Sequence, residues 1–195
     1  MYPFFKNTFD FITAFILIVI LFPILLIISI IIKLTSRGPI IFLQKRLGIN
    51  GSIFNIYKFR TMFHDSPDLR NPDGTTFNSP KDFRVTKFGK FLRETSLDEL
   101  PQLINIIRFE MSFVGPRPEL AESLETHTEY EYKRLLIKPG ITGLSQVQGR
   151  NMIDIRQRRI IDVNYQEKYN FTLDLKIIFK TIFLIVSQKT IYTKK

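Results

Sequence analysis

The sequence predicts a helix-dominated α/β protein: a compact domain with a small β-hairpin, joined to an apolar N-terminal helix. Three observations support this fold class. An uncharged run of 22 residues extends from Phe11 to Ile32. Two short β-rich segments flank Asn50-Gly51, a pair that favours a tight turn between strands. Several later segments carry apolar residues at helical spacing.

Composition limits the partners and the chemistry of this chain. Its 195 residues carry a net charge of +10, so we expect anionic partners: a phospholipid surface, nucleic acid or phosphorylated substrates. The absence of cysteine excludes disulfide bonds and thiolate metal sites. The length suits one domain with one appendage.

The N-terminal apolar run is long enough to reach across a bilayer. A straight helix over Phe11 to Ile32 would measure about 33 Å. Pro23 lies at its centre, where proline removes a backbone hydrogen bond and favours a kink. Two half-length legs could then enter the membrane and return to the same face. A spanning anchor is the alternative, since transmembrane helices tolerate proline and both flanks are weakly positive.

The predicted hairpin pairs residues 40–44 with residues 53–59. Alternation along the second strand places Lys58 and Arg60 on one face. Basic side chains on a rigid strand suit phosphate binding, although a solvated face has the same pattern. A polar loop rich in proline follows over residues 64–81.

Two adjacent carboxylates, Asp98 and Glu99, are the strongest candidates for chemistry. Apolar residues at 100, 103, 104 and 107 follow at helical spacing, and Ser96 with Glu99 has the spacing of a capping box. The sequence therefore predicts that the pair lies at a helix N-terminus, which favours anions. An ordinary helix cap is the alternative interpretation.

Basic residues precede this pair at every third position, at 84, 87, 90 and 93. On a helix they would form a drifting stripe that contacts lipid headgroups or draws an anionic substrate toward Asp98. A solvated basic face is equally consistent with the pattern. Arg93 is the member nearest to the pair.

Arginines also follow the pair. Arg117 stands between Pro116 and Pro118, which restrict the backbone and present the guanidinium with little freedom to lose. A charged segment over residues 119–134 reads as helical. A glycine-punctuated loop or short strand over residues 138–151 ends near Arg150.

Two helices are predicted toward the C-terminus. Residues 153–169 form a polar, basic helix. Residues 171–186 form an amphipathic helix with Lys176 and Lys180 opposite an apolar face at 175, 178, 179, 182, 183 and 186. This second helix suits the membrane interface, although its apolar face could instead pack on the domain.

Taken in order, these segments resemble the small bacterial sugar transferases known as monotopic phosphoglycosyl transferases, of the undecaprenyl-phosphate glycosyl-1-phosphate transferase type. Each match is weak alone, and together they cover nearly the whole chain. The matching segments are the apolar helix with Pro23, Tyr57-Lys58-Phe59-Arg60-Thr61-Met62, Ser96-Leu97-Asp98-Glu99-Leu100, the segment from Met111 to Pro118, Pro139-Gly140-Ile141-Thr142-Gly143, Gly149-Arg150-Asn151 and Leu173-Asp174-Leu175-Lys176.

The resemblance implies an enzyme that transfers a sugar 1-phosphate from a UDP-sugar to a polyprenyl phosphate. It implies that Asp98 is the nucleophile, through a covalent phosphosugar intermediate, and that Glu99 helps to hold Mg²⁺. The basic candidates for phosphate binding are Lys58, Arg60, Arg93, Arg117 and Arg150. The chain departs from the family pattern at Phe22, where serine is frequent, and at Leu144, Gln148 and Asn164.

The expected organisation is a re-entrant membrane helix over residues 1–37 and a catalytic domain over residues 38–195, on the cytosolic face of the bacterial inner membrane. Membrane lipid is an expected partner and nucleic acid is not; a homo-oligomer is left open. The alternative function is a basic, membrane-anchored binding or assembly protein without catalysis.

Overall fold

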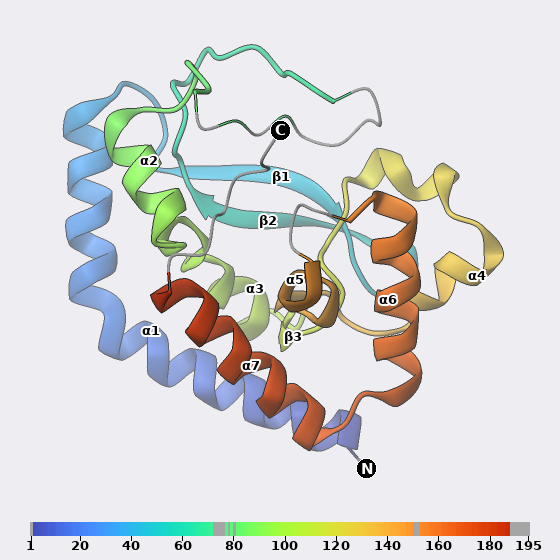
Figure 1. Cartoon of the computed structure of the whole chain (residues 1–195). Coiled ribbons are helices and arrows are strands. Elements are labelled where there is room, and N and C mark those ends of the chain that lie inside the picture. Colours follow the sequence, from blue (N-terminus) through green and yellow to red (C-terminus); the bar gives the residue numbers. More distant parts are fainter. Residues whose placement is uncertain (1, 72–76, 78, 80, 150–152, 188–195) are drawn as a thin grey trace.

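The computed structural model of the chain describes residues 2–71, 77, 79, 81–149 and 153–187 (Figure 1). Helices dominate these residues, as predicted. In chain order the elements are α1 (Tyr2–Thr35), β1 (Ile41–Leu47), η1 (Ile49–Gly51), β2 (Ile53–Phe59), α2 (Lys87–Glu94), η2 (Leu97–Glu99), α3 (Gln102–Ile107), β3 (Ser112–Val114), η3 (Ala121–Thr126), α4 (Glu129–Tyr132), η4 (Lys133–Leu136), β4 (Gly140–Thr142), α5 (Leu144–Gly149), α6 (Ile155–Lys168) and α7 (Phe171–Val186), where η marks a 3-10 helix.

Helix α1 is longer than the uncharged run and is bent. It begins at Tyr2 and contains Pro23. Figure 1 shows two legs that meet at a bend, one passing below the domain and the other rising beside it. By length and composition, α1 is the one helix of the described residues that could cross a membrane.

The β-hairpin forms as predicted, with a longer first strand. β1 and β2 are antiparallel, and the pairing runs from Ile41 with Phe59 to Leu47 with Ile53. Asn50 and Gly51 both adopt positive φ, at 54° and 76°, which is the backbone conformation that these two residue types tolerate best.

The segment around the carboxylate pair differs from the prediction. Ser96 has φ 58° and makes no side-chain cap, and residues 97–99 form the 3-10 turn η2 instead of the start of a longer helix. The next helix, α3, begins only at Gln102. The capping-box prediction was therefore wrong, because a cap residue needs extended backbone and Ser96 is left-handed.

Two further segments refine the sequence expectations. The predicted helix over residues 119–134 is broken into the short elements η3, α4 and η4. The glycine-rich segment supplies β4, which pairs in parallel with β3. α7 has the predicted bounds, and the Asn170 side chain caps it by accepting from the Leu173 N–H.

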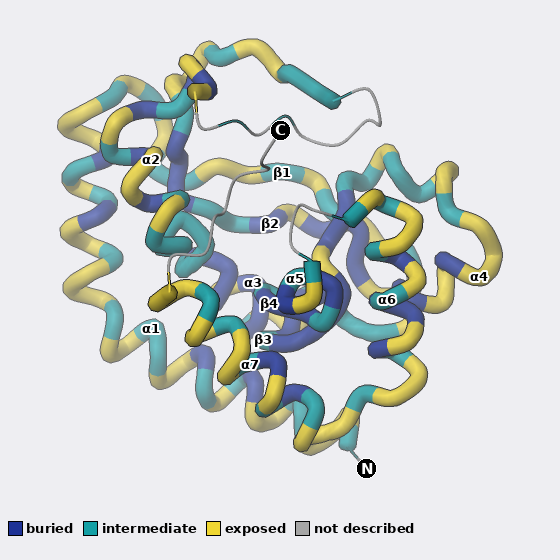
Figure 2. The backbone as a smooth tube through the Cα atoms, viewed as in Figure 1, coloured by how far each residue is buried: buried dark blue, intermediate teal, exposed yellow. Residues whose placement is uncertain are grey.

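Three apolar clusters make up the core, and α1 belongs to two of them. Ala14 on its first leg packs with residues of β2 and α3. Ile28 and Ile32 on its second leg pack with Phe59 and Leu92. Both legs thus lie against the same domain while their outer faces remain exposed (Figure 2).

Candidate active site

Asp98 and Glu99 lie on η2, in the short connection between α2 and α3. Their apolar neighbours fix this turn, because Leu97 and Leu100 pack against the cluster that contains Phe59 and Leu92. The carboxylate pair therefore stands on a turn anchored from one side by the core. Because the pair does not lie at the N-terminus of an α-helix, side chains have to supply the positive charge that stabilises its carboxylates.

Two cations from distant parts of the chain contact Glu99. Lys58 Nζ on β2 lies 2.5 Å from Glu99 Oε1, and both side chains are largely buried. Arg117, on the turn after β3, places a guanidinium nitrogen 3.9 Å from the same oxygen. The fold thus brings together three residues that the sequence singled out separately.

The environment separates the acidities of the two carboxyl groups. Burial raises the pKa of Asp98 to about 6, and Lys58 offsets part of that rise while Glu99 adds to it. Burial acts in the same direction on Glu99, but the charges of Lys58 and Arg117 outweigh it and hold the pKa of Glu99 below its usual value. Both groups are therefore mainly ionised at neutral pH, and Asp98 is the more basic of the two.

Arg93 is a third cation near the pair. Its Nε donates to Thr61 Oγ1 at 2.9 Å, and its charge is among those that lower the pKa of Asp98. Its position at the end of α2 matches the predicted approach of that helix to the carboxylates.

Arg60 lies apart from this group of cations. It follows the last residue of β2, and its buried guanidinium donates to the carbonyl oxygens of Ser36, at 2.9 Å, and of Arg37. These bonds tie the end of α1 to the hairpin. The role predicted for Arg60 in phosphate binding stays a prediction, and these bonds show that the residue also holds the end of α1. Arg150 lies outside the described residues.

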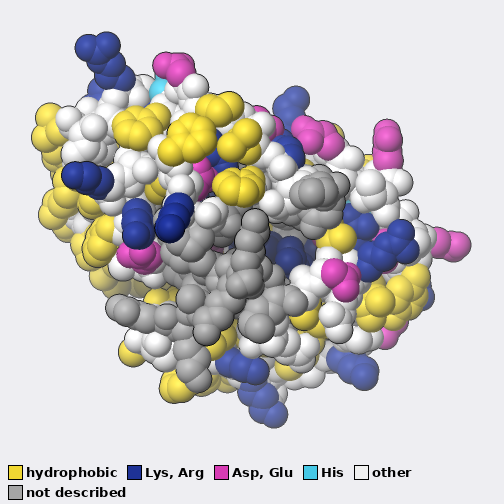
Figure 3. Space-filling view, turned by 45° about the horizontal axis from the view of Figure 1, so that its top comes forward, with side chains coloured by type: hydrophobic (Ala, Val, Ile, Leu, Met, Phe, Trp, Pro, Cys, Tyr) yellow, Lys and Arg dark blue, Asp and Glu magenta, His cyan; other side chains and the backbone are white. Residues whose placement is uncertain are grey.

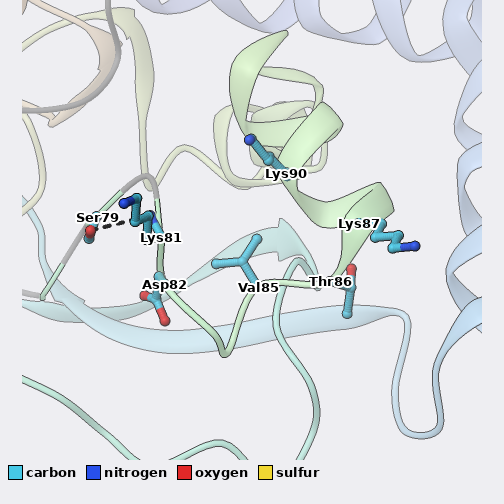
Figure 4. Close-up of a pocket in the computed structure, with 7 residues that line it drawn as sticks. All are labelled: Ser79, Lys81, Asp82, Val85, Thr86, Lys87 and Lys90. Carbon is cyan, nitrogen blue, oxygen red and sulfur yellow. Dashed lines mark hydrogen bonds between the residues drawn. The ribbon is translucent and has the colours of Figure 1, made fainter.

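The basic stripe before the pair is only partly a surface feature. Arg84 precedes α2 and is buried, with a guanidinium nitrogen 2.7 Å from Asp82. Lys87 and Lys90 are exposed on α2 and line a pocket of about 280 Å³, with Lys87 pointing away from Lys81 (Figure 4). The residues lining this pocket are Ser79, Lys81, Asp82, Val85, Thr86, Lys87 and Lys90.

A buried set of ion pairs stands behind Arg117. This inner ion-pair network consists of Glu119, Glu131, Arg134, Arg159 and Asp162. Arg134 lies 2.7 Å from Asp162 and 3.3 Å from Glu119, while Arg159 lies 2.8 Å from Glu119 and 3.3 Å from Glu131. Arg134 also donates to the Arg117 carbonyl at 2.7 Å, so the network fixes the turn that presents Arg117.

Sequence reasoning missed two further arginines near Arg117, namely Arg46 on β1 and Arg158 on α6. Arg46 donates to the Pro118 carbonyl at 3.1 Å, and its charge contributes to lowering the pKa of Glu99. A signal was present, because cross-strand pairing places Arg46 on the same hairpin face as Lys58. The predicted first strand ended at Gln44, two residues too early to include it.

The carboxylate pair fits a magnesium ion that arrives with phosphate. The described residues contain no group of three or more His, Cys, Asp or Glu that could form a metal cage. Mg²⁺ commonly uses one or two protein carboxylates and takes its other ligands from substrate phosphates and water. Asp98 and Glu99 provide such carboxylates next to cations that can hold a phosphate.

The pattern of the bacterial sugar transferase family matches residues 1–188. An undecaprenyl-phosphate glucose phosphotransferase of Komagataeibacter xylinus is 40% identical over 188 residues, which cover 91% of this chain and 35% of that protein. A UDP-glucose:undecaprenyl-phosphate glucose-1-phosphate transferase of Klebsiella pneumoniae is 40% identical over 196 residues, covering 96% of this chain and 41% of that protein.

A shorter relative has a length closer to that of this chain. An uncharacterized sugar transferase, EpsL, of Bacillus subtilis is 40% identical over 177 residues, covering 91% of this chain and 85% of that protein. The chain therefore spans less than half the length of the first two relatives and most of the third.

Proposed function

Because the chain belongs to the bacterial sugar transferase family, we propose that it transfers a sugar 1-phosphate from a UDP-sugar to a polyprenyl phosphate. The products are UMP and a polyprenyl diphosphate sugar, an early membrane-bound intermediate of a bacterial glycan. The observation that carries the proposal is the carboxylate pair held beside Lys58 and Arg117. The names of two relatives make UDP-glucose and undecaprenyl phosphate the first substrates to test.

Asp98 is the nucleophile in the proposed reaction. Its carboxylate oxygen attacks the phosphorus that bears the sugar, and the bond from that phosphorus to the bridging oxygen of UMP breaks, so that UMP leaves with the electron pair. An oxygen of the polyprenyl phosphate then attacks the same phosphorus and displaces the Asp98 carboxylate. A raised pKa supports this role, since it makes Asp98 a stronger nucleophile that is still ionised at neutral pH.

Positive side chains counter the repulsion between a carboxylate and two phosphates. Lys58 and Arg117 already lie against Glu99, and Arg93 approaches Asp98 from α2. Glu99 would hold Mg²⁺, which supplies further positive charge to the diphosphate when it is bound. The reaction has little need of Asp98 as a general base, because a phosphate acceptor is already largely ionised near neutral pH.

The same proposal gives α1 a re-entrant position in the membrane. Near its start, Lys6 lies 2.5 Å from Asp174 of α7, and Ser112 donates to Asp10 at 2.5 Å. Near its end, the carbonyl of Ser36 accepts from Arg60. Contacts from both legs to one domain support an entry and an exit on the same face of the bilayer.

Exposed apolar side chains continue from α1 onto α7. Phe5 on α1 and Phe171 on α7 have ring centroids 6.2 Å apart, and Phe179, Ile182 and Phe183 are exposed farther along α7. Hydrophobic side chains also line the edge of the molecule that carries α1 (Figure 3, left). This surface supports contact with a membrane. We assign it to the cytosolic face of the bacterial inner membrane because the proposed donor, a UDP-sugar, is available there.

One assay tests the reaction. The full chain in detergent is mixed with Mg²⁺, undecaprenyl phosphate and a panel of UDP-sugars, beginning with UDP-glucose, and UMP release is measured. Without acceptor, the covalent route predicts about one UMP per active site and a sugar label that stays on the protein through denaturation. Release that requires acceptor and leaves no label would exclude the covalent route. Absence of UMP release with every donor would exclude the proposed transferase activity. Undiminished UMP release in the presence of EDTA would exclude the proposed requirement for Mg²⁺.

Topology needs a separate test. The chain has no cysteine, so Thr8→Cys on the exposed side of α1 provides a single labelling site. A re-entrant helix keeps this residue on the cytosolic side, where an impermeant thiol reagent reaches it only in inverted vesicles. Labelling from the periplasmic side of intact cells would show a spanning helix. Pro23→Ala should shift the population toward spanning, because it restores the missing backbone hydrogen bond.

A further inference from the structure

Three arginines from separate elements lie around the turn that presents Arg117 to Glu99. This outer arginine cluster consists of Arg46 on β1, Arg117 on the turn after β3 and Arg158 on α6. Arg46 is fixed beside Arg117 because its side chain donates to the Pro118 carbonyl and its backbone forms a bridge with Leu120. The Arg158 side chain donates to the Ile153 carbonyl at 3.4 Å.

The positive charge of this cluster is not matched by carboxylates. Within the described part of the chain, no carboxylate oxygen lies within 4.0 Å of the Arg46 or Arg158 guanidinium, and Arg117 reaches Glu99 only at 3.9 Å. Glu99 already forms its short contact with Lys58. Glu119 and Asp162 also lie near enough to interact with Arg46 or Arg158, but they are paired with Arg134 and Arg159 of the inner ion-pair network. The cluster therefore carries more positive charge than these carboxylates offset.

Arg117 is the common neighbour of the other two arginines. Arg158 stands one helical turn before Asp162 on α6, and Arg134, the partner of Asp162, donates to the Arg117 carbonyl. Burial lowers the pKa of Arg46 to about 10, and the charge of Arg117 contributes to the shift. Burial followed by the charge of Arg117 also lowers the pKa of Arg158. Gathering like charges is unfavourable, and an oxyanion bound among them would relieve the repulsion.

The hydrogen bonding of Arg46 suits a phosphate ligand. Its two terminal nitrogens donate to neutral acceptors, the Pro118 carbonyl and Gln44 Oε1, so they are positioned without losing their charge. Its buried Nε has no partner among the described residues. Each terminal nitrogen carries a second N–H beyond the one used in these bonds, and the planar guanidinium suits bidentate binding of phosphate oxygens.

The place of the cluster favours a soluble ligand. Arg46 lies five residues along β1 from Ile41, about 17 Å at the usual rise of a strand. Figure 1 shows that β1 begins beside the rising leg of α1 and runs away from it toward α4 and α6. The cluster is therefore displaced from that leg, which we place in the membrane.

We propose that Arg46 and Arg158, together with Arg117, bind the diphosphate of the nucleotide donor and hold it against the carboxylate pair. The identity of the donor rests on the proposed function, whereas diphosphate binding rests on the geometry of the cluster. Arg46 and Arg158 are then substrate-binding residues in addition to those predicted from the sequence.

Binding of inorganic pyrophosphate and of UDP to the full chain in detergent tests this proposal by calorimetry, without turnover. Arg46→Gln and Arg158→Gln should each weaken both ligands by about tenfold to a hundredfold, because each removes a charged hydrogen-bond donor. Lys45→Gln and Arg156→Gln are matched controls, since both residues are exposed neighbours of the same elements and should leave binding unchanged. Arg46→Lys, which keeps the charge, should lie between wild type and Arg46→Gln.

The outcomes separate the cluster from the reaction. Wild-type affinity in both glutamine variants with unchanged melting temperatures, or no pyrophosphate binding by the wild-type chain, would overturn the proposal. If Arg46→Gln fails to fold, Arg46→Lys and Arg158→Gln decide it. Diphosphate binding through the cluster without UMP release from any UDP-sugar would reject the transferase and leave the cluster intact. In the full assay, an increase in the KM for polyprenyl phosphate instead of the donor would overturn the assignment to the donor.

Discussion

The inner ion-pair network and the active site both bring arginines and carboxylates together, but they balance charge differently. In the network, Arg134 and Arg159 contact Glu119, Glu131 and Asp162 at 2.7–3.3 Å. In the active site, Lys58 forms the short ion pair with Glu99. The outer arginine cluster has no carboxylate at a comparable distance among the described residues. Matched charges hold a turn in place, whereas unmatched charges are available to a substrate.

The largest expected effect is on the nucleophile. Asp98→Asn should lower the rate of UMP release by about 10³-fold or more, because the variant cannot form the acyl phosphate. Its melting temperature should match that of the wild type. Glu94→Gln is the matched control, as an exposed carboxyl group at the end of α2 that should keep full activity. Normal turnover by Asp98→Asn would show that Asp98 is not the nucleophile.

The next effect is on the network and should appear as lost stability. Arg134→Met leaves Asp162 buried without its ion-pair partner and leaves Glu119 with Arg159 alone. Breaking a buried pair by removing one partner typically costs about 3–5 kcal/mol of unfolding free energy. Denaturant unfolding in detergent measures the loss. Arg108→Met, at the exposed pair with Glu110, is the control and should unfold like the wild type. Wild-type stability of Arg134→Met would show that the network is not structural.

Lys58 pairs with Glu99 and also acts on Asp98, so its replacement should change the pH profile of kcat/KM. Its charge lowers the pKa of Asp98, so Lys58→Gln should raise that pKa. Because only the ionised carboxylate attacks, kcat/KM falls as the pH drops through the pKa of Asp98. The acid limb, expected near pH 6 in the wild type, should therefore move to higher pH, with about 10-fold to 100-fold lower activity on the plateau. An acid limb at the same pH in both proteins would show that the charge of Lys58 does not affect the pKa of Asp98.

The smallest expected effect concerns His127 at the edge of the network. Burial lowers the pKa of this histidine in the folded protein, while the unfolded chain titrates near its ordinary value of about 6.5. The unfolded state therefore binds more protons below that pH, and stability falls as the solution becomes more acidic. His127→Gln should flatten this dependence between about pH 5 and 7. Equal slopes for the two proteins would contradict the assignment.

Local sequence signals were sufficient for much of the architecture. Asn50-Gly51 determined the hairpin turn, because positive φ is a property of those residues. The apolar spacing along residues 171–186 predicted α7 with its observed bounds. Each signal acts within a few residues and needs no knowledge of the rest of the fold.

Local signals failed where a distant contact decided the outcome. Ser96 has a good capping pattern, yet the packing of Leu97 and Leu100 against Phe59 and Leu92 accompanies a left-handed residue and a tight turn instead. In the sequence, Arg60 alternates with Lys58, and Arg84 belongs to the series of basic residues that ends at Arg93. Their burial against Ser36 and Asp82 became visible only in three dimensions.

The sequence alone therefore determined the β-hairpin, the C-terminal helix α7, the apolar helix with its central proline and the choice of Asp98 and Glu99, because composition, periodicity and motif are local. Only the tertiary structure decided which cations serve that pair. Lys58 and Arg117 meet Glu99 across separations of 41 and 18 residues, and Arg46 joins them through its bond to Pro118. A charge acts over a few ångströms of space, and its distance along the chain does not reveal which charges share that space.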